Sequence, residues 1–178
     1  TSPTNNGAFK KQSKEKFVEK LLESLPFIPS YFPFNVTINK RGAANLETAI
    51  GSIPFSEKSA ASGLLVDMRD EKTFKKGHLK GSINIQAMSD DAKFETWLGS
   101  IVRPKEEFTL IIDGKEHLDK LLNRVAKIGY EKQLTQVITI ADEDLVVLKQ
   151  LNLKDFKKNP DKYTIVDVRN TSEVEEGK

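Results

Sequence analysis

The residues that could carry chemistry stand together in one short stretch, LIIDGKEHL (residues 110–118). Its apolar, β-branched beginning is typical of a buried strand, and the amphipathic pattern after Gly114 predicts a helix. The loop between a strand and a helix N-terminus offers backbone N–H groups and the positive end of a helix dipole to an anion or a reactive group. The reactive side chains available there are the carboxylate of Asp113 and the imidazole of His117.

Asp113 and His117 are four residues apart, a spacing at which a base and a nucleophile could act together. The sequence offers no third group to orient such a pair, so a catalytic pair is the weaker interpretation. We interpret Lys115 as a charge partner of Asp113 rather than as a catalyst. The loop also lacks the glycine density of a phosphate-binding loop, which argues against a nucleotide site.

Composition excludes several other kinds of site. The 178 residues contain no cysteine, which removes disulfides, zinc–thiolate sites and thiol catalysis and fits a cytoplasmic protein. His78 and His117 are the only histidines, too few for a His-rich metal site. The formal net charge of +2 gives no reason to expect a nucleic-acid partner, and no apolar run is long enough to cross a membrane.

Strand and helix patterns alternate along most of the chain, which predicts an α/β fold with a mainly parallel sheet flanked by helices in three layers. The expected strands are 63–68, 82–85, 108–113 and 134–140. The expected helices are 13–25, 90–101, 115–129 and 141–151, and a short helix with a following turn is expected over 71–81. Trp97 is expected in the core with Phe94 and Leu98, or at a contact between domains. Gly129 is expected at a helix C-cap.

A helix and an arm precede these elements. Ser13 is expected to cap helix 13–25, which Pro26 ends. The stretch PFIPSYFPF (26–34) has three prolines and four aromatic residues, a composition that disfavours both a helix and a central strand. We interpret it as an extended arm on an apolar surface, which belongs either to this chain's own core or to a neighbouring domain.

The chain contains an internal repeat: LLVDMRDEKTFKKG (64–77) returns as TIVDVRNTSEVEEG (164–177). Three residues keep their spacing, so that Asp67, Arg69 and Gly77 recur as Asp167, Arg169 and Gly177. A carboxylate at a strand end can cap the next helix and pair with an arginine, so we expect a structural role for these residues. The second copy stops after one strand and the beginning of a helix, so we interpret the sequence as a piece of a longer chain.

The stretch VDMRDEKTFKKGHLKGSINI resembles the opening signature of rhodanese-like domains. The matching residues are Asp67, Arg69, Phe74, Gly77, His78, Leu79, Gly81 and Asn84. The segment FTLIID…LLNRVAKIGY is similar to the strand, active-site loop and helix that follow in that family, so the resemblance covers residues 56–150. In this signature we expect His78 to hydrogen-bond backbone groups rather than to bind a metal or transfer protons.

The resemblance implies a site for sulfur transfer, in which a cysteine after the third strand carries a persulfide that loop N–H groups stabilise. Asp113 occupies the position of that cysteine, with Gly114, Lys115 and His117 as its loop neighbours. An aspartate cannot hold a persulfide, and its own charge would fill the anion-binding loop. The loop is also shorter than in active members. The resemblance therefore implies a cysteine-less pseudo-rhodanese without a catalytic residue of its own.

Residues 7–43 and 94–113 are similar to segments of proteins that join a metallo-β-lactamase-fold domain to rhodanese domains. This implies a connecting helix and arm over 1–55, a cysteine-less rhodanese-like domain over 56–150, and the start of a second repeat over 151–178. The implied parent is a persulfide dioxygenase or a glyoxalase-II-like thioester hydrolase whose other domain holds zinc or iron. None of those metal ligands can be placed here, so no cofactor is expected in these residues.

We therefore expect an inactive spacer or docking module in sulfur metabolism, with the metallo-β-lactamase-fold and rhodanese domains of the same chain as its partners. Two other functions stay open: a hydrolase that depends on Asp113, since rhodanese-like folds include phosphatases, and a regulatory module that binds a ligand in the vacated loop. Self-association of the protein also stays open.

Overall fold

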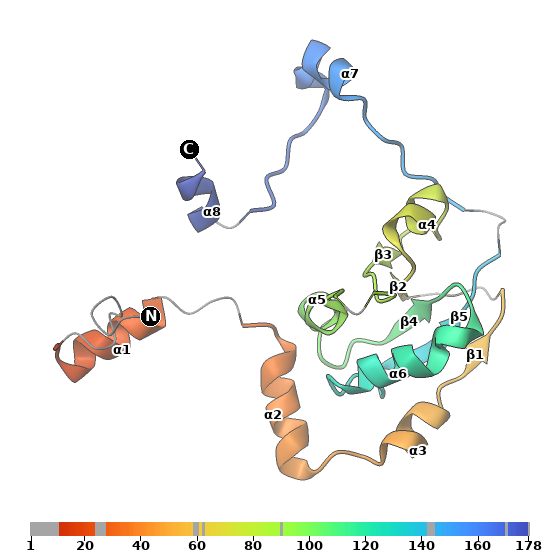
Figure 1. The fold of residues 1–178 in the computed structure, drawn as a ribbon, viewed down its shortest axis with the longest axis horizontal. Helices are drawn as coiled ribbons and strands as arrows, with labels where there is room; N and C mark the ends of the chain where they lie inside the picture. The colour runs from red at the N-terminus through yellow and green to blue at the C-terminus, as the bar shows by residue number, and fades with distance from the viewer. Residues whose placement is uncertain are drawn as a thin grey trace. The chain divides into compact units, whose positions relative to one another are not determined.

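The computed structural model of the chain describes residues 11–23, 28–58, 61, 63–89, 91–141, 145–169 and 171–177 (Figure 1). The chain divides into two compact units, residues 1–146 and 147–178. No helix among the described residues combines the length and the apolar character that crossing a bilayer requires.

The first unit is built on a parallel sheet of five strands in the order β1-β5-β4-β2-β3. The strands are β1 (Phe55–Ser56), β2 (Leu64–Asp67), β3 (Ile83–Asn84), β4 (Phe108–Ile111) and β5 (Leu134–Ile138). The four predicted strands are confirmed. The sequence pattern missed β1, because two residues are too few to show an alternation. Asp67 lies opposite Ile111, so β2 and β4 end side by side.

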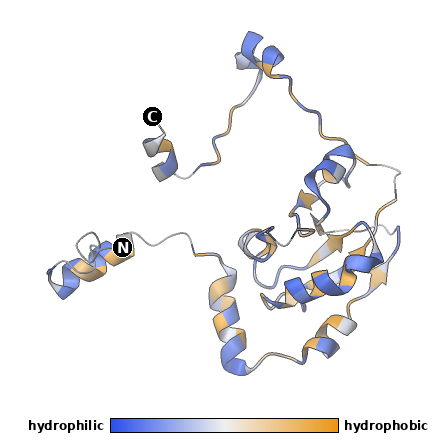
Figure 2. Ribbon diagram, viewed as in Figure 1, coloured by the Kyte–Doolittle hydropathy of each residue, from blue (hydrophilic) through white to orange (hydrophobic). Residues whose placement is uncertain are grey.

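Helices cover the sheet, as predicted for an α/β fold. The first unit contains the helices α1 (Lys14–Glu23), α2 (Tyr31–Arg41), α3 (Leu46–Gly51), α4 (Glu71–Lys76), α5 (Phe94–Ile101) and α6 (Leu118–Ala126), and the 3₁₀ turn η3 (Lys115–His117). Successive strand residues face opposite sides of the sheet. Val66 and Leu110 belong to the main apolar cluster, with side chains from α5 and α6, whereas Leu65 and Ile111 belong to a smaller one. The strands are accordingly apolar in Figure 2, and α6 carries polar residues on its outer side.

The expected extended conformation of 26–34 is wrong from Tyr31 onward, where α2 begins. Pro33 is the third residue of this helix, a position whose N–H would have no acceptor within the helix, so proline is tolerated there. Ser13 does cap α1, since its hydroxyl oxygen accepts from the Lys16 N–H at 3.3 Å. Pro26 lies outside the described residues.

Helix α2 packs on the core of its own chain. Tyr31 and Phe34 contact the main apolar cluster, and the rings of Phe34 and Tyr130 meet edge to face with centroids 5.8 Å apart. Tyr31 lies so close to Gly99 in α5 that a Cβ at 99 would collide with its ring. Ile38 fits in the same way over Gly129, which adopts φ +71°. The C-cap expected at Gly129 is wrong, because α6 ends at Ala126 and its C-cap is Lys127. The aromatic segment was expected to lie either on the chain's own core or on a neighbouring domain, and Tyr31 and Phe34 contact the chain's own core.

The helix expected over 141–151 is wrong for the residues described there. Residues 145–151 are not helical, and Val146 instead pairs with His78 in an antiparallel bridge. Its two backbone hydrogen bonds measure 3.0 and 2.8 Å, and Leu145 packs against Gly77, where a Cβ would come within 2.8 Å of Cδ1. A short apolar run is compatible with either a strand or a helix. Here the extended conformation is selected because Val146 pairs with the backbone of His78.

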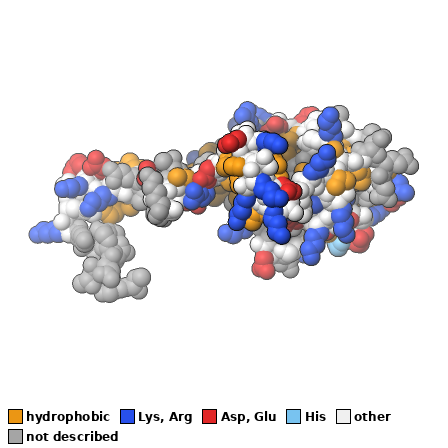
Figure 3. Space-filling model, turned by 90° about the horizontal axis from the view of Figure 1, so that it is seen from above, with side chains coloured by type: hydrophobic (Ala, Val, Ile, Leu, Met, Phe, Trp, Pro, Cys, Tyr) orange, Lys and Arg blue, Asp and Glu red, His pale blue; other side chains and the backbone are white. Residues whose placement is uncertain are grey.

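The core position expected for Trp97 is also wrong, because 58% of its surface is exposed. Helix α5 packs through Phe94, Leu98 and Gly99, and Trp97 lies outside that contact. Other apolar side chains also stay on the surface between charged ones, as Figure 3 shows for one face of the molecule.

The second unit contains α7 (Leu153–Lys158), the 3₁₀ turn η4 (Pro160–Lys162) and α8 (Thr171–Glu176). None of its residues for which burial is described is buried. The strand expected in the second copy of the repeat is not formed: residues 164–168 are not assigned to a strand, and Val166 and Val168 are 73% and 91% exposed. A strand needs a neighbour to pair with, and none pairs with these residues in the described part of the chain.

Candidate functional site

The loop that carries Asp113 begins at the centre of the sheet. Strand β4 is buried along its whole length, and the Ile112 N–H donates to Ile138 O at 2.9 Å, which fixes the point where the chain leaves the sheet. Gly114 is extended, residues 115–117 form η3, and α6 follows directly. The predicted order of strand, short loop and helix is confirmed.

The structure does not bring the predicted reactive groups of this loop together. Asp113 is exposed, and among the described residues no hydrogen bond or ion pair involves its carboxylate. The nearest acid to His117 is Glu116, whose Oε1 lies 3.8 Å from Nε2. Lys115 does not pair with Asp113 either, because its ammonium lies 5.8 Å from the centroid of the Phe55 ring, where it makes a cation–π contact.

A carboxylate does occupy the loop, but it belongs to Glu116. Its side chain folds back over Gly114, so that a Cβ at position 114 would collide with both carboxylate oxygens. The sequence pointed to Asp113 for this role because its position follows the strand. Glu116 lies at the start of a helical turn, where a negative charge is favoured. An external anion entering this loop would meet that charge.

The residues of the repeated signature form a structural joint between β2, α4 and β3. The carboxylate of Asp67 is fully buried and accepts from Arg69 Nε at 2.9 Å and from Nη2 at 2.6 Å. Nη2 also donates to Gly77 O at 2.8 Å. Asn84 Nδ2 donates to the carbonyl oxygens of Asp67 and Arg69 at 3.0 and 2.9 Å. Every donor and acceptor named here is satisfied within the fold, so this cluster supports the site without presenting groups to a ligand.

Two details of the joint differ in how well the sequence predicted them. The helix cap expected from Asp67 is supplied by Asp70, whose Oδ1 accepts from the N–H groups of Lys72 and Thr73. The Thr73 hydroxyl also donates to Asp70, which lowers the pKa of that carboxyl. The backbone role expected for His78 is confirmed: Nδ1 lies 3.0 Å from Phe74 O, and the ring stacks on the Phe74 ring. Gly81 adopts φ +85° in the following turn, where glycine is favoured.

An arginine that the sequence analysis passed over shapes the other side of the site. Arg124 of α6 is buried and donates to the carbonyl oxygens of Ala87, Ser89 and Ala92, which holds the segment between β3 and α5. It also pairs with Glu95 through Nε and Nη2, at 3.0 and 2.7 Å. The Arg124 guanidinium lowers the pKa of Glu95 to about 2. The available signal was the charge at position 124 on the buried face of an amphipathic helix.

The second copy of the signature reproduces only the local part of this joint. Arg169 Nε and Nη2 reach Asp167 at 3.0 and 2.7 Å, and the Arg169 N–H donates to Asp167 Oδ1 at 3.0 Å. Both side chains remain about half exposed. The ion pair therefore forms without the surrounding core, as its short sequence spacing allows.

Among the described residues, no three side chains of the metal-ligating types His, Asp and Glu gather into a cluster. This part of the chain thus contains no candidate centre for a metal ion.

Comparison with known proteins identifies the domain. Residues 55–139 match the family of rhodanese-like domains. A solved structure that resembles the chain is titled a metallo-beta-lactamase from Staphylococcus aureus subsp. aureus COL. The two share 25% sequence identity and a TM-score of 0.58, over 76% of this chain and 38% of that protein. The chain thus spans well under half of the length of that relative, and the search of curated proteins finds no match. Residues 55–139 are a rhodanese-like domain, and one in a chain without cysteine.

Proposed function

We propose that this rhodanese-like domain is a catalytically inactive module, which connects a metal-dependent hydrolase or persulfide dioxygenase domain to a sulfur-carrying rhodanese domain in one protein. The observation that carries the proposal is the residue after β4: where an active member places its cysteine, this chain has the exposed Asp113, and it has no cysteine elsewhere. The Glu116 carboxylate over Gly114 adds a negative charge where a persulfide would need donors.

The likeness to part of a protein titled a metallo-beta-lactamase supports the multidomain context. In the proposed parent, zinc or iron would lie in the metallo-β-lactamase-fold domain, outside the residues present here. The internal repeat supports a second rhodanese-like domain that would follow. Connecting two such domains raises the effective concentration of one active site near the other, which favours transfer of a sulfur-containing intermediate between them.

Helix α2 supports a spacer of defined geometry. It leads into the domain from the N-terminal side and fits onto it through Gly99 and Gly129, two close contacts that leave little room for a change of angle. A spacer that holds its neighbours in place needs such a fixed connection at the point where the chain enters.

The multidomain context is tested by the intact mass of the protein isolated from its native source. We expect a mass well above the 20.0 kDa of this chain, with bound zinc or iron. A native mass near 20 kDa would overturn the multidomain proposal.

The inactivity of the domain is tested with the present chain. We expect no thiocyanate from thiosulfate and cyanide above the protein-free blank, and no hydrolysis of p-nitrophenyl phosphate. Addition of sulfite, thiosulfate, glutathione or phosphate should leave the melting temperature unchanged, since a ligand of the folded state would raise it. Turnover that is lost in Asp113→Asn, or a shift of several degrees, would contradict the proposal.

A further inference from the structure

Helix α2 has an outer surface that is unusual for this chain. Residues 24–39 contain no charged side chain, although 30% of all residues of the chain are charged. The exposed side of this segment carries Ile28, Phe32, Pro33 and Val36, and we call these four residues the outer stripe. The side chains at 28, 32 and 36 are 55%, 48% and 52% exposed. A helix that is apolar on more than one side is normally buried on each of them.

Helix α6 shows what an outer surface in contact with water looks like in the same domain. Its buried residues include Leu121 and Val125, whereas the exposed positions carry Asp119, Lys120 and Asn123. The outer stripe of α2 has apolar side chains where α6 has polar and charged ones. A group of exposed apolar side chains, unlike single ones scattered over a surface, marks a site of interaction.

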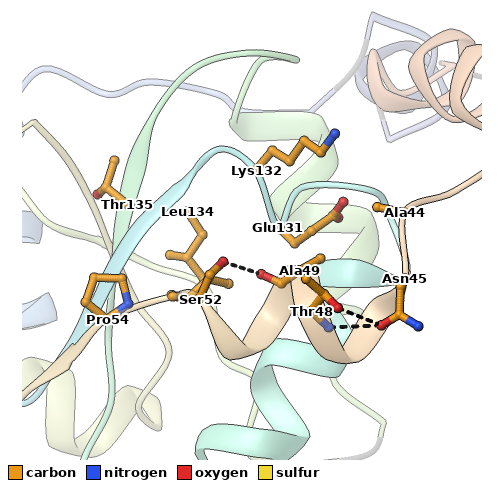
Figure 4. A pocket seen from close by; sticks show the side chains of 11 residues that line it. Ala44, Asn45, Thr48, Ala49, Ser52, Pro54, Glu131, Lys132, Leu134 and Thr135 are labelled. Atoms are coloured by element: carbon orange, nitrogen blue, oxygen red, sulfur yellow. Dashed lines mark hydrogen bonds between the residues drawn. The ribbon is translucent and has the colours of Figure 1, made fainter.

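The inner side of α2 is fixed on the domain, so the outer stripe is held facing away from it. Phe34 contacts the main apolar cluster, and Ile38 packs over Gly129. The next helix, α3, is fixed by its own cap, in which Asn45 Oδ1 accepts from the N–H and the hydroxyl of Thr48 at 3.0 and 3.2 Å (Figure 4). Helix α2 therefore cannot turn to bury the outer stripe without losing the contacts of its inner side.

The chain enters and leaves the first unit on opposite faces of the sheet. Phe34 of α2 packs on the main apolar cluster, which lies on one face. At the exit, Val146 pairs with His78, and the adjacent Leu79 packs on the smaller cluster, which lies on the other face. The outer stripe is thus on the side where a preceding domain would be attached.

The comparison with the metallo-beta-lactamase structure points to the same side. It covers 76% of this chain, a larger share than residues 55–178 make up, so part of the segment before residue 55 takes part in the likeness. The match takes up 38% of that protein, so most of its length has no counterpart here. A segment before the rhodanese-like domain is therefore shared with a protein that has further chain for this segment to contact.

We propose that the outer stripe of α2 is the docking surface for the metal-dependent domain that precedes this one in the parent protein, and that it meets an apolar, uncharged patch there. Helix α2 then lies between two domains with one side on each. Removing Phe32 and Val36 from water favours such a contact, and no charged group of the outer stripe has to be desolvated. The inference rests on the proposed connecting function and adds to it the surface that holds the first domain.

The test is site-specific photo-cross-linking in the intact protein, with benzoylphenylalanine in place of Phe32. We expect mass spectrometry to find the cross-linked peptide among the residues that precede this chain. A cross-link to the residues that follow it, to α1 or to a second copy of the protein would overturn the proposal, as would the absence of a cross-link. The matched control carries benzoylphenylalanine in place of Trp97, an exposed side chain of α5, and should not label the preceding domain. Equal labelling of that domain from both positions would also overturn the proposal.

A charge placed in the outer stripe tests the strength of the same contact. Val36→Glu should leave the melting temperature of the present chain within about 2 °C, since the side chain is exposed there. In the intact protein it should lower the cross-link yield from position 32 at least about fivefold, because docking would bury the charge. Asn123→Glu adds the same charge at an exposed position of α6 and should leave the yield unchanged. An unchanged yield in Val36→Glu would overturn the proposal.

The outcomes separate this inference from the connecting function on which it rests. A native mass near 20 kDa would remove the preceding domain and overturn both. A larger native protein without a cross-link from position 32 to its preceding domain would overturn the docking surface alone.

Discussion

The two Asp–Arg pairs of the repeat are the same interaction in two environments. In both, the arginine Nη2 lies within 2.7 Å of the carboxylate, and the backbone N–H of the arginine donates to the same oxygen of the aspartate. Asp67 is fully buried, whereas Asp167 is about half exposed. The two pairs thus share residue types and spacing but differ in burial and in the unit to which they belong.

We expect Asp67→Asn to lower the free energy of unfolding by about 3 kcal/mol, because it leaves the Arg69 charge buried without its partner. Asp167→Asn is the matched control and should change it by less than about 0.5 kcal/mol, as is typical of exposed pairs. Urea denaturation of both variants measures the difference. Equal effects of the two substitutions would show that burial does not set the strength of the first pair.

At the scale of single residues, the sequence predicted contacts that are local and missed those that need the fold. The Asp67–Arg69 pair spans two residues, so its geometry can be anticipated from spacing alone. Arg124 reaches residues about 30 positions earlier in the chain, and Glu116 turns back on Gly114 through a side-chain conformation that spacing does not reveal. The Asp113–Lys115 pair was expected from proximity in sequence, yet a neighbouring aromatic ring holds the lysine instead.

Among the elements, α2 shows how a close helix contact is made. Gly99 lies in the interior of α5, where alanine would ordinarily be more stable by about 1 kcal/mol. Glycine is needed there because the Tyr31 ring fills the space of a side chain. The backbones of α2 and α5 can thus approach closely, and Ser30 Oγ donates to Gly99 O at 3.2 Å across the contact.

We expect Gly99→Ala to lower the free energy of unfolding by about 1–2 kcal/mol, since the overpacking outweighs the gain in helix propensity. Amide hydrogen exchange in α2 should become faster in this variant. The matched control is Gly51→Ala at the end of α3, where a Cβ meets no atom within 4 Å and the change should be neutral or slightly stabilising. An increase in stability for Gly99→Ala would mean that the Tyr31 ring moves aside at little cost and that other contacts hold α2 on the domain.

The elements that the sequence predicted best are those with a long apolar period. Apolar residues recur along the whole length of strands β2, β4 and β5 and of helices α5 and α6. The predicted bounds of each of these elements lie within a few residues of those in the structure. Helix α2 was missed because its proline falls in the first turn, where the usual rule against proline does not apply. Strand β1 and the bridge at Val146 depend on pairing with distant residues, which a local pattern cannot show.

In the whole molecule, buried side chains are found in the first unit. The second unit has helices and the Asp167–Arg169 pair, but none of its residues for which burial is described is buried. Local hydrogen bonds and exposed ion pairs contribute little net free energy, so such a segment has little cooperative stability of its own.

We expect a chain of residues 1–146 to keep the free energy of unfolding of the full chain within about 0.5 kcal/mol. A peptide of residues 147–178 should show no cooperative thermal transition by circular dichroism, because it lacks a core. The truncation retains Leu145 and Val146, which contact Gly77 and His78. A loss of more than about 1 kcal/mol would indicate that the second unit stabilises the first.

The position of the Glu116 carboxylate also bears on how this domain could change in evolution. A cysteine substituted at position 113 would stand in a loop that already contains a negative charge over Gly114. That charge would raise the thiol pKa and leave the residue a poor nucleophile, so the substitution alone would bring little selective advantage. If the domain is inactive as proposed, a gain of sulfur chemistry should therefore be easier when Glu116 is replaced together with Asp113.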